Sequence, residues 1–234
     1  MEFKRLDNRE AAQASGVVVV VDVIRAFTTA AYALDGGARD IVLTDTVERA
    51  LALRARFPGA WVMGEERGIT PEGFDLGNSP SALAGLDLAG RRLIQRTTAG
   101  TQGVVRSSAR ADVVLPCSLC VAHAVARAVE RLAPKAVTFV ITGTWPGHPV
   151  HTGAEDAACA DYVEALLRGE TPDREATVRR VLDSPNGRGF LDPDRPELPA
   201  ADMAYCTAID RFDFWLRVTR QDDLLVMTAE PAGL

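Results

Sequence analysis

Residues 17–34 read VVVVVDVIRAFTTAAYAL, and this stretch decides the fold. Its first part, Val17–Asp22, is a near-continuous β-branched run, as expected of a strand that is buried on both faces of a sheet. Its second part, Arg25–Leu34, is rich in alanine and is followed by Gly36-Gly37, which predicts a helix that ends there. A buried strand that passes directly into a helix is typical of α/β proteins.

The same order of strand and helix recurs along the chain. The other expected strands are Asp40–Leu43, Trp61–Met63, Arg92–Gln95, Asp112–Leu115 and Val137–Ile141. The other expected helices are Thr46–Phe57, Thr101–Ala109, Ser118–Leu132 and Ala154–Leu167. The alternation predicts a layered α/β/α fold with a mostly parallel or mixed central sheet.

The pattern changes after Gly169. The elements expected there are a short helix (Thr177–Leu182), an irregular excursion rich in Pro, Gly and Asp (183–200) and a closing strand pair (Phe212–Val218 and Leu224–Met227). We expect a single domain over residues 1–234, in which residues 170–234 are a candidate for a partly separate C-terminal lobe.

The composition is that of an ordinary soluble protein. Hydrophobic residues make up 47% of the chain and charged residues 25%, and the mean hydropathy is +0.01. The longest apolar run, Val17–Val21, is too short to cross a bilayer, and residues 1–16 lack the apolar segment of a signal peptide. We therefore expect a cytoplasmic protein with no membrane partner. In that compartment the 4 cysteines are expected to be free thiols.

The net charge is −6, and the arginines are scattered along the chain. This disfavours nucleic acid as a partner, because binding to a phosphate backbone needs a concentrated basic surface. A small anionic substrate is compatible with the sequence, since one or two arginines are enough to hold it. A homo-oligomer is also compatible with the sequence, which does not determine the oligomeric state.

Ligands of parallel α/β sheets bind beyond the carboxyl ends of the strands. That rule selects four segments, which are Asp22–Thr29, Gly64–Ser79, Arg96–Thr101 and Thr142–Asp156. The second belongs to the long loop GEERGITPEGFDLGNSP, residues 64–80. Its length and its glycines and prolines favour a binding or catalytic loop over a solvated connector.

The first segment combines acidic, basic and hydroxyl groups. Asp22 ends the strand, and Arg25 and the pair Thr28-Thr29 follow at the start of the helix. The carboxylate could bind Mg²⁺ or act as a nucleophile. The arginine, the hydroxyls and the helix N–H groups could cradle a phosphate. The alternative is that Asp22 only caps the helix and pairs with Arg25 on the surface.

The third segment, RTTAGT, repeats this theme after another strand. Thr97, Thr98, Gly100 and Thr101 could supply backbone and hydroxyl donors to an oxyanion, although an ordinary helix N-cap would need only one of them.

The fourth segment ends with Glu155-Asp156 at the start of a helix, where the helix dipole alone would favour acidic residues. If they instead face Asp22 and either Glu65 or Glu66, they would complete an oxygen-ligand site for Mg²⁺. Because Mg²⁺ usually takes one or two carboxylates, not all of these acids can be ligands.

Weaker signals include Cys117-x-x-Cys120 with His123, which fits either a zinc or redox site or small core cysteines in a helix. His148 and His151 lie in a glycine-rich loop, where either could meet a substrate.

Several common catalytic motifs are absent from the sequence. These are the G-x-x-x-x-G-K-[ST] phosphate loop, the G-x-S-x-G elbow, H-E-x-x-H and the G-x-G-x-x-G dinucleotide turn. Ile24 stands where haloacid-dehalogenase-type phosphatases have their second aspartate, which disfavours that family.

Several segments together resemble the 2-phosphosulfolactate phosphatase family. They are DVIRAFTT (22–29), GFDLGNSP (73–80), RTTAGT (96–101), AEDAACA (154–160) and the tail DMAYCTAIDRFDF (202–214). The order and spacing agree over roughly residues 15–168, and GFDLGNSP is the most specific piece. The resemblance implies a magnesium-dependent phosphatase of coenzyme M biosynthesis that converts 2-phosphosulfolactate to sulfolactate and phosphate. It also implies a compact α/β layered fold unrelated to the haloacid dehalogenases.

The residues and the resemblance together define a candidate site. The catalytic candidates are Asp22, Asp75 and Glu155, and the candidate metal ligands are Asp22, Glu65, Glu155 and Asp156. The candidates for binding substrate or phosphate are Arg25, Thr28, Thr29, Arg67, Asn78, Ser79, Thr97, Thr98, Gly100 and Thr101. The Gly-Glu-Arg of the family aligns either on Glu65 or, with a one-residue gap, on Glu66-Arg67.

The chain departs from the family pattern at three positions. Phe27 replaces a small hydroxyl residue, Ala99 replaces the asparagine of T-T-N-G-T, and Val121 stands where the family often has asparagine. These departures leave the substrate more open than the reaction class. The alternatives are a phosphatase that acts on another phosphorylated hydroxy acid and a non-catalytic anion-binding homologue.

Overall fold

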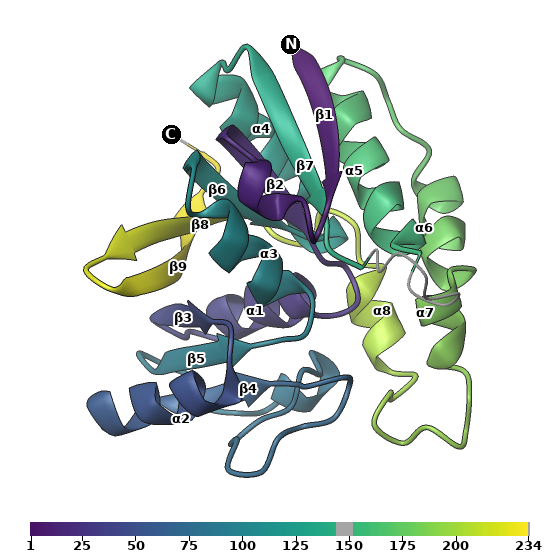
Figure 1. Ribbon diagram of the computed structural model, residues 1–234. Helices are drawn as coiled ribbons and strands as arrows, with labels where there is room; N and C mark the ends of the chain where they lie inside the picture. The colour runs from purple at the N-terminus through teal and green to yellow at the C-terminus, as the bar shows by residue number, and fades with distance from the viewer. Residues whose placement is uncertain (144–151, 234) are drawn as a thin grey trace.

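The computed structural model describes residues 1–143 and 152–233 and contains a mixed β-sheet with helices packed against it (Figure 1). This confirms the predicted α/β class. The strands are β1 (Glu2–Asp7), β2 (Gly16–Val21), β3 (Asp40–Thr44), β4 (Trp61–Gly64), β5 (Arg92–Arg96), β6 (Ala111–Cys117), β7 (Ala136–Ile141), β8 (Phe214–Gln221) and β9 (Leu224–Pro231). The α-helices are α1 (Ala26–Asp35), α2 (Val47–Arg56), α3 (Gly100–Ser107), α4 (Ala122–Leu132), α5 (Ala154–Leu167), α6 (Arg174–Leu182), α7 (Pro185–Gly189) and α8 (Asp202–Cys206).

The strands lie in the order β1-β7-β2-β6-β8-β9-β3-β5-β4. Two groups within this order are parallel, namely β1-β7-β2-β6 and β3-β5-β4. In the first group Val18–Val21 are fully buried, which is why this run contains no polar residue. The helices α1 and α3 lie between the two groups in Figure 1, and α5 packs on β2 and β7.

The C-terminal hairpin β8–β9 joins the two parallel groups. β8 pairs antiparallel with β6, and β9 pairs antiparallel with β3. The strand pair that the sequence predicts at the end of the chain therefore lies in the middle of the sheet. Its inward side chains Leu216 and Met227 are fully buried. Whether the chain is one domain stays a prediction.

The topology brings the ends of distant strands together. Helix α3 follows β5 but packs against β2, so the turn between β5 and α3 passes close to the end of β2. The carboxyl end of β7 is adjacent to that of β2, because the two strands are parallel neighbours. Three of the segments that the sequence selects therefore meet at one edge of the sheet.

Four elements differ from the sequence prediction, and one of them is α8 (Asp202–Cys206), for which no helix was predicted. Strand β1 has no counterpart among the predicted strands, because this edge strand contains only exposed and half-buried side chains and no apolar run. The helix expected from Ser118 begins at Ala122, after a 3₁₀ turn over Leu119–Val121. The excursion expected to be irregular contains α7, in which Ser184 caps the helix through Gly187 N–H and proline occupies the first turn.

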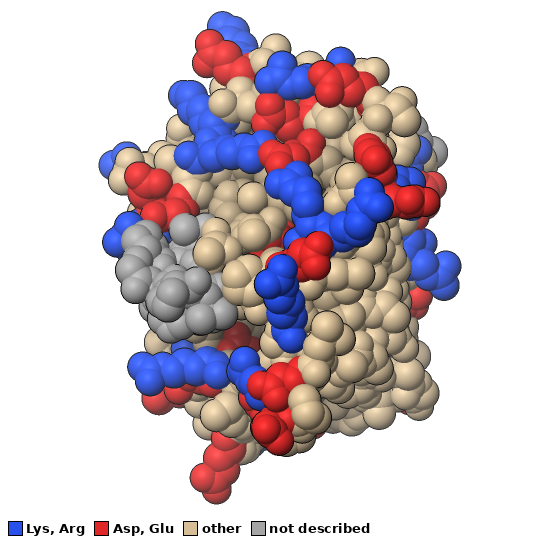
Figure 2. Space-filling view, turned by 90° about the vertical axis from the view of Figure 1, so that its right-hand side faces the viewer, with Lys and Arg blue, Asp and Glu red and all other residues tan. Residues whose placement is uncertain are grey.

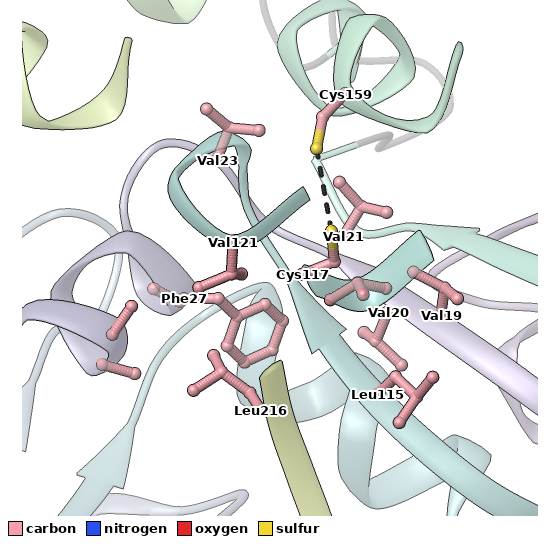
Figure 3. Packing of buried hydrophobic residues seen from close by; sticks show 14 of the residues in the cluster. Val19, Val20, Val21, Val23, Phe27, Leu115, Cys117, Val121, Cys159 and Leu216 are labelled. Atoms are coloured by element: carbon pink, nitrogen blue, oxygen red, sulfur yellow. Dashed lines mark hydrogen bonds between the residues drawn. The ribbon is translucent and has the colours of Figure 1, made fainter. Parts of the chain in front are cut away.

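The cysteines Cys117, Cys120, Cys159 and Cys206 are all buried and free, as predicted. The Sγ atoms of Cys117 and Cys159 lie 3.9 Å apart among valine side chains of the core (Figure 3). The His123 side chain is exposed, whereas Cys117 and Cys120 are fully buried. In the part of the chain that the structure describes, no three Asp, Glu, His or Cys side chains converge into a group that could hold a metal. The zinc interpretation therefore has no support.

Charges of both signs are interleaved on the face shown in Figure 2. Ion pairs such as those of Arg5 with Asp161 (2.6 Å) and Glu164 (2.9 Å) account for mixing of this kind on α5. Within the described residues of this face no continuous basic surface is visible. The described helices also include none with the length and apolar character needed to span a membrane.

Replacing Leu216 with alanine tests the role of the hairpin. The side chain is fully buried in the strand that joins the two parallel groups. We expect Leu216→Ala to lower the free energy of unfolding by about 2–5 kcal/mol, since it leaves a cavity. Leu191→Ala is the matched control, because Leu191 is 73% exposed and should change stability by no more than about 0.5 kcal/mol. Urea denaturation measures both, and equal effects would contradict the assigned role.

Candidate active site

Asp22 is buried at the end of β2, and its two carboxylate oxygens have different surroundings. Oδ1 accepts a hydrogen bond from Ala26 N–H (3.0 Å) at the start of α1, which is the capping role considered from the sequence. Oδ2 points toward Gly100, where an added Cβ atom would lie only 2.7 Å away. Glycine at position 100 therefore permits the close approach of the β5–α3 turn to this carboxylate.

Asp156 and Glu155 reach the same place from the start of α5. Asp156 accepts hydrogen bonds from Val23 N–H and Gly143 N–H, both at 2.8 Å. The Thr142 hydroxyl lies 3.4 Å from Asp22 Oδ2 and 3.5 Å from Asp156 Oδ2. A Cβ atom at Gly143 would lie 3.0 Å from Asp156 Oδ2 and 3.1 Å from Glu155 Oε1. The three carboxylates thus lie near the end of β7, although among the described residues no three acids converge on a single metal position.

Glu155 has one free carboxylate oxygen in a buried position. Oε1 accepts a hydrogen bond from Asn186 Nδ2, whereas Oε2 is buried and has no hydrogen-bond partner among the described residues. The same is true of Asn78 Oδ1 in the long loop. Buried oxygens of this kind are costly unless they have a ligand.

Burial raises the pKa of Asp22, Glu155 and Asp156. The pKa of Asp22 rises to about 7, chiefly through burial and further through the negative charges of Glu65 and Glu155. Burial, followed by the charges of Glu155 and Asp22, holds the pKa of Asp156 well above its ordinary value. Burial also raises the pKa of Glu155. A cation at this edge of the sheet would favour the ionised forms.

Glu65 is the fourth buried acid, and the β5–α3 turn holds it in place. Its carboxylate accepts hydrogen bonds from Thr98 N–H (2.6 Å), the Thr98 hydroxyl (2.8 Å) and Gly68 N–H (2.7 Å). Arg67 is exposed, and its N–H donates to the Thr98 hydroxyl (2.7 Å). Glu66 is exposed and pairs with Arg96 (2.8 Å) instead. The Gly-Glu-Arg of the family aligns either on Glu65 or on Glu66-Arg67. Because Glu65 is buried and Glu66 is exposed, the geometry favours Glu65 as the acid near Asp22.

All five of the predicted threonines make hydrogen bonds within the protein, and those of Thr98 are the contacts with Glu65 and Arg67 given above. Thr97 and Thr101 cap each other, since each hydroxyl accepts from the other's N–H (2.8 and 3.0 Å). The Thr28 hydroxyl donates to Val23 O (2.8 Å), and the Thr29 hydroxyl donates to Asn78 O (3.3 Å). These hydroxyls therefore stabilise the turns around the site.

Arg25 is buried, in contrast to the surface pairing considered as an alternative. It pairs with Asp202 (2.8 Å), a residue that is fully buried. The other oxygen of Asp202 accepts hydrogen bonds from the Ser79 hydroxyl (2.7 Å) and Ser81 N–H (3.0 Å). Sequence reasoning gave no role to Asp202 or Asn186. The available signal for Asp202 was its place in the tail that resembles the family.

The structure does not bring Asp75 to the other carboxylates through any described contact. Its carboxylate accepts a hydrogen bond from Val62 N–H (2.8 Å) in β4 and lies 3.5 Å from Arg54 in α2. These contacts hold the long loop against β4. The catalytic role considered for Asp75 stays a prediction. His148 and His151 lie outside the described residues.

The three departures from the family pattern have two kinds of surroundings. Phe27 and Val121 are fully buried members of one hydrophobic cluster, and both appear in its interior in Figure 3. Ala99 contributes its carbonyl oxygen, which accepts a hydrogen bond from Asn8 (3.1 Å). Two of the three substitutions therefore change the packing of the core.

The stability of the metal-free protein should depend on pH through Asp22. Its pKa is about 7 in the folded state and near 3.8 when free, so the folded state binds the proton more tightly. This contribution is fully present below about pH 4 and is lost as the pH rises through about 7. Urea denaturation in EDTA should show that Asp22→Asn reduces this loss. Asp75→Asn is the control, and an unchanged pH dependence in Asp22→Asn would contradict the assignment.

Comparison with known proteins places this arrangement in a family. The family model described as 2-phosphosulpholactate phosphatase matches residues 4–220. A probable 2-phosphosulfolactate phosphatase of Bacillus subtilis is 32% identical over 207 residues, which cover 88% of each chain. Its counterpart of Deinococcus radiodurans is 41% identical over 151 residues, which cover 64% of this chain and 61% of the relative. The chain therefore belongs to the 2-phosphosulfolactate phosphatase family of phosphoric monoester hydrolases.

Proposed function

We propose that the protein hydrolyses 2-phosphosulfolactate to sulfolactate and phosphate in a Mg²⁺-dependent reaction. The observation that carries the proposal is the unpartnered, buried oxygen of Glu155 beside Asp22 and Asp156. The names of the relatives support the substrate. The sequence resemblance suggests a place for the reaction in coenzyme M biosynthesis, and we propose a cytoplasmic location.

The described residues do not gather three Asp, Glu, His or Cys side chains into one group that could hold a metal, but one or two carboxylates are enough for Mg²⁺. This ion prefers oxygen ligands and usually takes one or two carboxylates, with water and substrate phosphate in the remaining positions. Asp22 Oδ2 and Glu155 Oε2 are the candidate ligands, and Asn78 Oδ1 is a further unpartnered oxygen of the right kind. When bound, Mg²⁺ would neutralise charge that develops on the phosphoryl group.

The protein's own groups would hold the substrate and move the proton. Arg25 offers a planar, bidentate donor to the phosphate or to the second acidic group of the substrate. A carboxylate with a pKa of about 7, such as Asp22, fits a group that activates water or attacks phosphorus directly. Backbone N–H groups hold the carboxylates of Glu65 and Asp156 in place. These carboxylates would contribute to the electrostatic potential at Asp22.

The burial of Phe27 and Val121 supports the same class of substrate as the family. Both side chains pack among hydrophobic residues of the core. A different phosphorylated hydroxy acid remains the alternative, because Ala99 removes an amide from the β5–α3 turn.

The proposed activity is tested by phosphate release from racemic 2-phosphosulfolactate, with and without Mg²⁺, alongside phospholactate and phosphoglycolate. We expect release from the sulfonate in the presence of Mg²⁺ and a loss of release in EDTA. Phosphate release only from phospholactate or phosphoglycolate would show that the protein is a phosphatase with a different substrate. No release from any of the three would support the anion-binding alternative.

Asp22→Asn should lower kcat by about 10²–10⁴-fold, the usual contribution of a proton-transferring group. Asp75→Asn should retain most of the activity, because its carboxylate contacts Val62 and Arg54. Steady-state kinetics on both variants measures the difference. Near-wild-type kcat in Asp22→Asn would remove this residue from the mechanism, and a comparable loss in Asp75→Asn would restore it to the catalytic set.

A further inference from the structure

We infer that residues 184–202, here called the clamp segment, complete the active site from the C-terminal part of the chain. In this inference Asn186 and Asp202 are positioning residues that act through Glu155 and Arg25. The inference rests on the proposed function, because it names the groups that orient the proposed ligand and the proposed phosphate-binding arginine. From the sequence, residues 183–200 are expected to be an irregular excursion, and Asp202 belongs to the tail that resembles the family.

Asn186 fixes the orientation of Glu155. Its Nδ2 donates to Glu155 Oε1, so the carboxylate is held by one oxygen while Oε2 stays unpartnered among the described residues. Glu155 is 2% exposed, which leaves little room for another rotamer. The Ser184 cap and the α7 turn that follow from Ser-Pro hold Asn186 at this position. A carboxylate that is oriented through one oxygen and has its other oxygen unpartnered is the arrangement expected of a residue that binds a metal ion.

Asp202 fixes Arg25 in a comparable way. One oxygen of Asp202 accepts from Arg25 Nη1 (2.8 Å), and the clamp also supplies Glu197 O to the same nitrogen (3.3 Å). Within residues 1–143 and 152–233, the hydrogen bonds of Arg25 come from Nη1, and in this inference Nε and Nη2 are the donors to the anion. The other oxygen of Asp202 holds Ser79 at the end of the long loop.

The clamp connects these two contacts through one helical turn. Phe190 stacks against the Arg25 guanidinium, with 5.1 Å between the ring centroid and the arginine Cζ. Asn186 and Phe190 are four residues apart, and Phe190 keeps helical backbone angles at the end of α7. Residues with this spacing lie on one helix face, about 5–6 Å apart. Asn186 and Phe190 therefore contact Glu155 and Arg25 from the same face of this helical turn.

Full-length protein and two double-mutant cycles test the inference. The measurements are kcat and KM for 2-phosphosulfolactate, the affinity for Mg²⁺, and the affinity for inorganic phosphate by calorimetry. Asn186→Ala should weaken Mg²⁺ binding and lower kcat by about 10–100-fold, as is usual when a group that orients a metal ligand is lost. In a Glu155→Gln background the same substitution should add less than about twofold, because its target is already altered.

The second cycle concerns Arg25. Asp202→Asn should raise KM and weaken phosphate binding by about tenfold, and should have less than about twofold effect in an Arg25→Gln background. The double variant also removes the buried charge that Asp202→Asn leaves without a partner, so it should fold. If Asp202→Asn alone does not fold, the Asn186 cycle decides, because Asn186 is only half-buried.

Asp210→Asn is the matched control. Asp210 lies in the same tail and pairs with Arg174 (2.8 Å) and the Tyr162 hydroxyl (2.9 Å), outside the candidate site. It should change thermal stability and leave KM and both affinities within about twofold of the wild type.

Losses that are equal in both backgrounds, or a change in thermal stability alone, would overturn the inference. If the wild type releases no phosphate, the proposed function fails, but phosphate and Mg²⁺ affinities still decide the inference. A wild type that binds neither ligand overturns both.

Discussion

The arrangement of the site depends on the repulsion between carboxylates that are buried together. Asp22, Glu155 and Asp156 are each at most 4% exposed, and neighbouring carboxylate charges raise the pKa of Asp22 and of Asp156 beyond the effect of burial. Such a cluster is unfavourable in an isolated core, where acids are normally paired or replaced by apolar residues. A site that binds a cation and a phosphate gives the cluster a physical reason to exist.

The fold supplies the positions for this cluster. Asp22 stands at the end of a strand whose valines are buried on both faces, and the neighbouring strand β7 ends beside it. The turn between β5 and α3 also reaches this cluster, although β5 belongs to the other parallel group. It can do so because α3 packs against β2 and because Gly100 has no side chain that would collide with Asp22. The hairpin β8–β9 keeps the two groups in one sheet, so the C-terminal part of the chain determines how the N-terminal residues meet.

Much of this could be predicted from periodicity and from turn chemistry. The valine run, the glycine stops and the acids at the start of α5 have local signals, and the helix Ala154–Leu167 agrees with its predicted bounds. The sheet order had no such signal, since pairing of β8 with β6 depends on contacts far apart in the sequence. For the same reason Asn186 and Asp202 were missed. The segment GFDLGNSP also suggested that Asp75 acts together with the other carboxylates. In the structure the carboxylate of Asp75 instead contacts β4.

The release of protons when Mg²⁺ binds tests the central claim most directly. At about pH 6.5 a carboxyl group with a pKa of about 7 is largely protonated, and a ligand must lose its proton. Calorimetric titration of the wild type with Mg²⁺ in two buffers of different ionisation enthalpy measures this release. The account predicts proton release near pH 6.5 that declines above about pH 8 and is reduced in Asp22→Asn. Mg²⁺ binding without proton release, or no saturable Mg²⁺ binding, would contradict a metal site built on these carboxylates.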